Sequence, residues 1–211
     1  MSNVYNTPQE AFWAGDFGDK YILRNMDPSL LAGRLNMFSK VLNLTGPLES
    51  ALEIGPNIGL NLKALEMLVP GIQLTGVEIN KEASEILRGN GDFEVINLSV
   101  LDYQADKTFS MVFTRGVLIH INPDMLPGIY DKMYEMTDEY ILVAEYYNPS
   151  PTMIPYRGEQ DRLFKRDFAG DLMERFPELK LIGYGFEYKR DPLFPQDDVS
   201  WFLLRKERSN D

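Results

Sequence analysis

The chain has 211 residues, of which 44% are hydrophobic and 25% are charged, and it contains no cysteine. This composition suits one well-buried domain, and no stretch approaches the roughly 18 consecutive apolar residues of a membrane span. The lack of cysteine excludes disulfides and thiolate metal ligands. The net charge of −11 argues against a nucleic-acid substrate, because nucleic-acid binding largely neutralises phosphates. Since the N-terminus has no basic and apolar leader, we expect a cytoplasmic location.

Residues 1–26 form the first segment, which is rich in aromatic side chains between Phe12 and Tyr21. We expect this segment to be an N-terminal cap that covers a ligand site. The dipeptide Asp27-Pro28 then predicts the start of the first core helix, because an acidic N-cap followed by proline is a favoured opening. Apolar residues at helical spacing continue that helix to Leu42.

The segment from Ala51 to Gly59 predicts a parallel strand, a turn of small residues and a helix. Gly55 and Gly59 allow positive φ and close approach of the backbone to a ligand, and Asn57 also tolerates a left-handed conformation. Such a turn places backbone N–H groups at a helix start, beside the end of a strand. The next apolar run ends at Glu78, whose carboxylate is suited to binding a ribose diol. The pattern predicts a site for a nucleotide-type cofactor.

Two kinds of cofactor compete for this turn. Dinucleotide sites favour G-x-G-x-x-G, whereas here Glu53 precedes the first glycine in the spacing E-x-G-x-N-x-G. A carboxylate suits the sulfonium and ammonium groups of S-adenosylmethionine (SAM), which carries no phosphate. The loop and the acid after the next strand resemble the signature of class I methyltransferases, from which Asn57 departs. The resemblance implies cofactor contacts from Glu53, Gly55, Asn57, Gly59, Glu78 and Ile79. A strand-turn-helix with no ligand is the alternative.

Apolar runs and helical patterns alternate through most of the chain. Further strands are predicted at residues 74–77, 93–98, 109–114, 140–144, 181–188 and 199–204. Helices are predicted at residues 60–69, after Asn80, after Asn122-Pro123, and at residues 168–176. This alternation predicts an α/β, Rossmann-like fold with helices on both faces of a seven-stranded, mostly parallel sheet that has an antiparallel terminal strand. We expect a single domain over residues 1–211.

Ligands of open α/β sheets bind at the carboxyl ends of the strands, so the residues after each apolar run are candidates. Asp102 follows the third strand, and the methyltransferase resemblance implies a contact with the adenine amino group. An aspartate that only forms a turn is the alternative. Arg115 follows the fourth strand, where methyltransferases line the methionine moiety, and Arg24 is available for the methionine carboxylate.

His120 is the only histidine of the chain. Its neutral imidazole could deprotonate a hydroxyl or amine at neutral pH, which makes it our candidate general base. The alternative is a structural histidine that caps or supports the following helix. His120 and the scattered acids show no metal-ligand spacing, so we expect no metal.

Residues 149–166 combine prolines, tyrosines and cations, and we interpret them as a substrate loop or lid. Tyrosine rings and hydroxyls, together with arginine, suit a polyol acid. The expected substrate contacts are Tyr146, Tyr147, Tyr156, Arg157, Arg162 and Lys165. The alternatives are a proline-stiffened lid packed by its own aromatic rings and solvated cations paired with neighbouring aspartates.

Segments along almost the whole chain carry a narrower resemblance, to the methylases associated with pseudaminic acid biosynthesis. They are residues 12–18, 21–25, 52–61, 145–151, 156–158, 163–170 and 196–202. In that family, asparagine belongs to the middle position of the turn. The resemblance implies a class I fold and methyl transfer connected with a nonulosonic acid or a related bacterial surface sugar.

We therefore expect a SAM-dependent methyltransferase that releases S-adenosylhomocysteine (SAH) and acts on a small anionic sugar, with no nucleic-acid or membrane partner. The alternatives are a noncatalytic SAM-binding partner or regulator in a sugar-modification assembly, a protein methyltransferase and an NAD-dependent enzyme. No motif specifies the acceptor atom or the oligomeric state.

Overall fold

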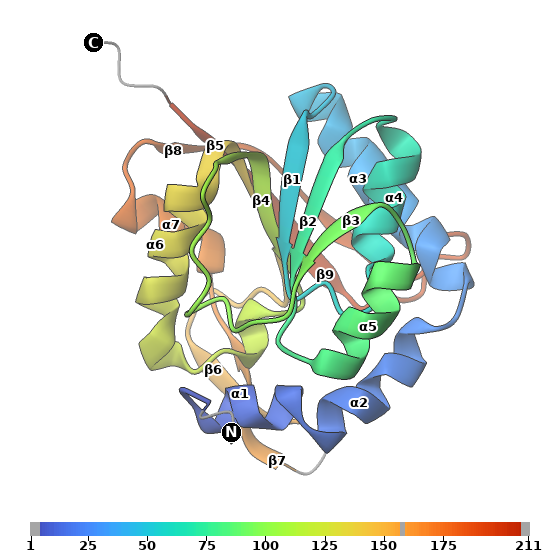
Figure 1. The fold of residues 1–211 in the computed structure, drawn as a ribbon. Helices are drawn as coiled ribbons and strands as arrows, with labels where there is room; N and C mark the ends of the chain where they lie inside the picture. The colour runs from blue at the N-terminus through green and yellow to red at the C-terminus, as the bar shows by residue number, and fades with distance from the viewer. Residues whose placement is uncertain (1–4, 157–158, 208–211) are drawn as a thin grey trace.

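The computed structural model describes residues 5–156 and 159–207. Its centre is a seven-stranded sheet of order β3-β2-β1-β4-β5-β9-β8 (Figure 1). The strands of this sheet are β1 (Ser50–Ile54), β2 (Gln73–Val77), β3 (Phe93–Ile96), β4 (Phe109–Arg115), β5 (Thr137–Glu145), β8 (Leu179–Glu187) and β9 (Val199–Lys206). Strands β1 to β5 are parallel, and β9 runs antiparallel to both of its neighbours. The predicted Rossmann-like fold class is confirmed, although β3 ends two residues earlier and β5 begins three residues earlier than predicted.

The order of the strands changes direction at β1. Strands β2 and β3 lie on one side of β1, and β4 and β5 lie on the other. In open α/β sheets, ligands bind in the crevice at the carboxyl ends of the strands at such a switch point. Strand β1 ends at Ile54, whose neighbour on β4 is Thr114. The turn at residues 55–59 and the residues after β4 therefore lie at this crevice.

Helices cover both faces of the sheet (Figure 1). One face carries α3 (Ser29–Thr45), α4 (Leu60–Leu68) and α5 (Lys81–Gly89), and the other carries α6 (Leu126–Met136) and α7 (Phe168–Arg175). Asn80 caps α5 as predicted, because its side chain accepts a hydrogen bond from the backbone N–H of Ala83. Helix α3 begins at Ser29, one residue after the predicted first position, and the side chain of Asp27 accepts a hydrogen bond from the Ser29 N–H at 2.9 Å.

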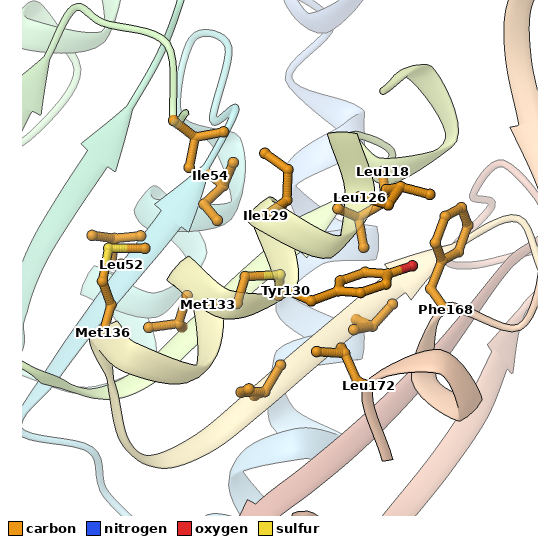
Figure 2. Close-up of a cluster of buried hydrophobic side chains, with 14 of the residues drawn as sticks. Leu52, Ile54, Leu118, Leu126, Ile129, Tyr130, Met133, Met136, Phe168 and Leu172 are labelled. Carbon is orange, nitrogen blue, oxygen red and sulfur yellow. The ribbon is translucent and has the colours of Figure 1, made fainter. Parts of the chain in front are cut away.

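The core has two parts, one on each face. Leu52 and Ile54 of β1 belong to the cluster under α6 and α7, which Figure 2 shows, whereas Ala51 belongs to the cluster under α3 and α4. Each fully buried aliphatic side chain stabilises such a core by roughly 1.5–3 kcal/mol. Because side chains alternate along a strand, Glu53 shares the α3–α4 face with Ala51. This alternation places a carboxylate beneath those helices.

Two small units lie at the carboxyl ends of the parallel strands (Figure 1). The first contains α1 (Pro8–Ala14), α2 (Asp16–Ile22) and the short 3-10 helix η1 (Leu23–Asn25), and the second is a hairpin of β6 (Thr152–Tyr156) and β7 (Glu159–Lys165). Two further 3-10 turns, η2 (Leu118–His120) and η3 (Pro123–Met125), follow β4. The sequence did not predict this hairpin, because prolines such as Pro155 are rare in central strands. In the structure, β6 belongs to a separate two-stranded sheet, and Pro155 lies where the pairing of the two strands shifts register.

None of the helices in the described part of the chain combines the length and the apolar character needed to cross a membrane.

Candidate functional site

The turn after β1 has the predicted left-handed conformation. The φ angles of Gly55, Asn57 and Gly59 are 68°, 52° and 87°. A Cβ atom at Gly55 would lie 2.7 Å from Cγ2 of Val117, so this position excludes a side chain on both conformational and steric grounds. The turn can therefore bring its backbone close to a ligand.

A cavity of about 190 Å³ lies beside this turn. Its lining combines residues that follow β1, β2, β4 and β5 with residues of α1, α2 and β6. The sequence-predicted site residues among them are Gly55, Asn57, Glu78, Ile79, Arg115, His120, Tyr146 and Tyr156. The structure thus brings together side chains that are far apart in the sequence.

Glu78 connects the turn to the end of β2. One carboxylate oxygen accepts the Asn57 N–H and the other accepts the Asn80 N–H, both at 2.8 Å. Burial raises the pKa of Glu78, and these backbone hydrogen bonds oppose that shift. A carboxylate oxygen has more than one lone pair, so both oxygens retain acceptor capacity toward the cavity.

Glu53 lies behind the turn and outside the cavity lining. Its Oε1 accepts a hydrogen bond from Nδ2 of Asn61 at 2.6 Å, and its Oε2 has no hydrogen-bond partner among the residues described. Burial raises the pKa of Glu53 to about 8, while the charges of Arg115 and Arg34 act in the opposite direction. At neutral pH the carboxyl group of Glu53 is therefore mostly protonated, and it ionises readily where a cation lies nearby.

Arg34 and Arg115 bring two guanidinium groups to the cavity. Nη1 of Arg34 and Nη2 of Arg115 both donate to Oε1 of Gln196, at 2.8 and 2.9 Å. The amide group of Gln196 is itself held, because its Nε2 donates to the Gly33 carbonyl at 2.9 Å. Burial lowers the pKa of Arg34 to about 9, so its guanidinium is a cation at neutral pH, and burial lowers the pKa of Arg115 as well. The two groups therefore place N–H donors on one wall of the cavity.

Tyrosine hydroxyls and one further acid complete this part of the cavity. Tyr21, Tyr146, Tyr156 and Asp197 all belong to its lining. Burial is the main cause that raises the pKa of Tyr156 to about 12, and the neighbouring Tyr21 adds to this shift. Burial also raises the pKa of Tyr146, and the charge of Asp197 adds to that shift. The hydroxyl groups therefore stay protonated and can both donate and accept hydrogen bonds.

His120 is buried and linked to the hairpin. Its Nδ1 lies 2.6 Å from the carbonyl oxygen of Arg162. A carbonyl oxygen only accepts, so Nδ1 carries the proton and Nε2 keeps a free lone pair. The ring packs against Trp13 and Tyr156, with centroid distances of 4.5 and 5.0 Å. Burial lowers the pKa of His120 to about 4, so the imidazole is neutral over the physiological range.

Glu145, at the end of β5, holds the backbone of η2. Its Oε1 accepts the N–H groups of Val117 and Leu118 at 3.0 and 3.1 Å, and its Oε2 accepts that of Ile119 at 3.5 Å. Burial raises the pKa of Glu145 to about 7 against these hydrogen bonds. Glu145 thus fixes the segment that presents His120 to the cavity.

Other sequence-predicted residues lie outside the cavity lining. Gly59 is the N-cap of α4, and Tyr147 packs against Phe202. Three cations lie over aromatic rings, namely Arg24 over Tyr21 at 5.6 Å, Arg162 over Phe12 at 5.0 Å and Lys165 over Tyr146 at 5.2 Å. Asp102 is exposed, and Arg157 lies outside the described residues.

Sequence reasoning missed Arg34 and Gln196 as site residues. Arg34 lies in a predicted helix, where a single cation has the pattern of a solvated face, and Gln196 was noted only within a resembling segment. No group of three or more potential metal ligands occurs among residues 5–156 and 159–207.

Comparisons with known proteins identify solved structures that share this fold. The 1,6-didemethyltoxoflavin-N1-methyltransferase of Burkholderia thailandensis, with bound 1,6-didemethyltoxoflavin and SAH, has a TM-score of 0.70 at 14% identity, covering 99% of this chain and 94% of that chain. Magnesium protoporphyrin IX methyltransferase of Synechocystis PCC 6803, with bound SAH, has a TM-score of 0.70 at 11% identity, covering 94% and 98%. The N-methyltransferase NodS of Bradyrhizobium japonicum WM9, in complex with SAH, has a TM-score of 0.68 at 14% identity, covering 95% and 97%.

No protein-family model matches the chain, and no curated protein matches it. At such low identities the structural likenesses concern the fold, and they show that the chain has the Rossmann-like fold of class I SAM-dependent methyltransferases.

Proposed function

We propose that this protein is a SAM-dependent methyltransferase that binds SAM in the cavity beside the turn at residues 55–59 and releases SAH. One observation carries the proposal: a glycine turn with left-handed backbone adjoins both Glu78 and the cavity, at the switch point of a fold that is shared with solved SAM and SAH complexes. Glu53, before the first glycine, supports SAM over a dinucleotide, because its ionised form would repel a pyrophosphate, whereas the acid after β2 binds a ribose in both kinds of site.

The residues present fit the parts of this cofactor. Glu78 has acceptor capacity for ribose hydroxyls, and Ile79 offers an apolar contact for the adenine ring. Gly55 and Asn57 provide backbone close to the ligand. We assign the methionine carboxylate to Arg34 and Arg115, because they reach the cavity while Arg24 lies outside its lining. A bound sulfonium and ammonium group would favour the ionised form of Glu53, behind the turn, and its charge would then stabilise them.

For the acceptor we propose a small acidic sugar of the nonulosonic type. Arg34 and Arg115 share one acceptor on Gln196, so together they retain donors for more than one carboxylate. The hydroxyl groups of Tyr21, Tyr146 and Tyr156 suit a polyol. The solved neighbours do not specify this substrate, since they are named as methyltransferases of a toxoflavin precursor and of a magnesium porphyrin. The sugar proposal rests on these side chains and on the sequence resemblance.

The chain's own residues can align and deprotonate such an acceptor. Bound SAM would supply an electrophilic methyl group on a sulfonium. Nε2 of His120 has a free lone pair and can accept the proton of the attacking hydroxyl or amine. Trp13 and Tyr156 pack around the imidazole and exclude water from it. Residues 1–26 would act as the cap and residues 149–166 as the substrate lid, with Tyr156 as the lid's contact to the cavity.

Transfer of labelled methyl tests this function. The purified protein is incubated with methyl-labelled SAM and a panel of acidic sugars, namely nonulosonic acids and their nucleotide-linked forms, with neutral sugars and peptides as controls. Label in an acidic sugar supports the whole proposal. Label only in a peptide would indicate a protein methyltransferase, and SAM binding without transfer to any acceptor would favour a noncatalytic SAM-binding partner.

A further inference from the structure

The acid that follows β3 does not reach the cavity. Asp102 is exposed, and its Oδ2 accepts a hydrogen bond from Nδ2 of Asn6 at 3.3 Å. Its backbone N–H donates to the Ser99 carbonyl at 3.1 Å, which closes a turn. Ser99 and Leu101 line the cavity at this position, and Asp102 does not.

A different carboxylate occupies this end of the cavity. Glu10 of α1 is 8% exposed and lies in the cavity lining. Its Oε1 accepts a hydrogen bond from Oγ of Ser99, and its Oε2 accepts the Asn6 N–H at 2.7 Å. The Glu10 N–H donates to Oγ1 of Thr7, the N-cap of α1, at 3.1 Å. The carboxylate is therefore held in a defined orientation.

The partners of Glu10 are neutral groups. The salt bridges found among the described residues do not include it. Burial of a carboxylate is costly unless hydrogen bonds compensate, and each oxygen of Glu10 has acceptor capacity left. The Ser99 hydroxyl has given its one donor to Glu10 and also accepts the Leu101 N–H at 3.1 Å. Glu10 is thus the carboxylate acceptor that this end of the cavity offers to a ligand.

The position of Glu10 relative to Glu78 suggests which ligand group it accepts. The Leu98 N–H donates to the Glu78 carbonyl at 3.2 Å, so the segment that ends in Ser99 lies directly beside the end of β2. Ile79, which follows Glu78, lines the same cavity as Glu10 and Ser99. A base attached to a ribose at Glu78 would therefore have Ile79 and Glu10 as neighbours.

We propose that Glu10, oriented by Ser99, recognises the 6-amino group of adenine, the role that sequence resemblance implied for Asp102. This inference rests on the proposed function, because it assumes that an adenosyl ligand binds in the cavity. An amino group donates hydrogen bonds to a carboxylate, whereas the 6-oxo group of hypoxanthine is repelled by it. Glu10 should therefore select adenine over hypoxanthine.

Calorimetric titration with SAH and with S-inosylhomocysteine, its hypoxanthine analogue, tests the assignment. The wild-type protein should prefer SAH by about tenfold or more, as expected for loss of a hydrogen bond to a charged group. In Glu10→Gln, the new side-chain amide can donate to the 6-oxo group, so the preference should shrink by about tenfold or reverse.

Two matched variants separate recognition from structure. Ser99→Ala breaks the same contact between α1 and the segment after β3 but keeps the carboxylate, so it should reduce the preference for SAH much less than Glu10→Gln does. Asp102→Asn should leave the affinities for both ligands unchanged. Thermal melting establishes that each variant is folded, and Ser99→Ala and Asp102→Asn test the assignment even where Glu10→Gln is unstable.

An unchanged ratio in Glu10→Gln, equal changes of the ratio in Glu10→Gln and Ser99→Ala, or a changed ratio in Asp102→Asn would overturn the assignment. Each of these results would leave the proposed function intact, because SAH still binds. A wild-type protein that binds neither ligand would overturn the proposed function and this assignment with it.

Discussion

Nδ1 of His120 lies 2.6 Å from the carbonyl oxygen of Arg162, which links the turn after β4 to strand β7. This contact does not cap the following helix, the structural role considered from the sequence. It fixes the tautomer of the imidazole and leaves Nε2 as the basic nitrogen. The same ring therefore serves the packing of the hairpin and, in our proposal, proton transfer.

The first prediction concerns the titration of His120. Because the chain has one histidine, its imidazole signals in an NMR spectrum are unambiguous. We expect a pKa near 4 and a proton on Nδ1 at neutral pH. Between pH 6.5 and 4 the unfolded chain binds a proton that the native state does not, so stability decreases as the pH is lowered from 6.5 to 4, by roughly 3 kcal/mol for this group. A pKa between 6 and 7 would contradict the buried, neutral ring.

The second prediction separates the two roles of His120. In His120→Asn, the side-chain amide can still donate to the Arg162 carbonyl, but nothing replaces Nε2. We expect a smaller loss of melting temperature than in His120→Ala, because the hydrogen bond is kept while the ring packing is lost, and a loss of turnover of about 10²–10⁴-fold. His120→Ala should lose both stability and turnover. A loss below about tenfold in His120→Asn, measured with the acceptor found by labelled methyl transfer, would remove His120 as the general base.

The third prediction concerns Glu145. Its pKa is raised from 4.5 to about 7, so between these values the native state holds a proton that the unfolded state has lost. This contribution to stability is present below pH 4.5 and is lost as the pH rises to 7. Glu145→Gln cannot titrate, so its free energy of unfolding should fall less than that of the wild-type protein over this range. Denaturant unfolding at pH 5 and pH 8 measures the difference, and parallel curves for the two proteins would contradict it.

The fourth prediction compares two arginines. Arg34→Gln should weaken SAH binding by about tenfold or more, because it removes a charged donor to the methionine carboxylate. The loss should disappear with 5′-methylthioadenosine, which has no carboxylate. Arg24→Gln should bind both ligands as the wild-type protein does, since Arg24 lies outside the cavity lining. Calorimetry decides between the two positions, and equal effects of the two substitutions would contradict the placement of the carboxylate.

Much of the fold follows from local patterns. The conformation of the turn was predictable because Gly55, Asn57 and Gly59 tolerate positive φ and few other residues do. The strands were predictable from short apolar runs, and the start of α5 was predictable from the Asn80 cap. In each case the signal lies within a few residues of the element that it specifies.

The rest depends on contacts between distant segments. Glu10 meets Ser99 from 89 residues away, and Arg34 meets Gln196 from 162 residues away. Within its own segment, each has the pattern of an ordinary surface residue. Asp102 had the expected position in the sequence, but the turn closed by Ser99 directs it to solvent. Spacing along the chain does not encode these orientations.

Binding of SAH to the wild-type protein and to Glu78→Ala tests the central claim most directly, with Glu82→Ala, an exposed acid on α5, as the matched control. We predict saturable binding to the wild-type protein, an affinity lower by about tenfold or more in Glu78→Ala, and wild-type affinity in Glu82→Ala. Absence of binding to the wild-type protein, or an unchanged affinity in Glu78→Ala, would contradict the proposed cofactor site.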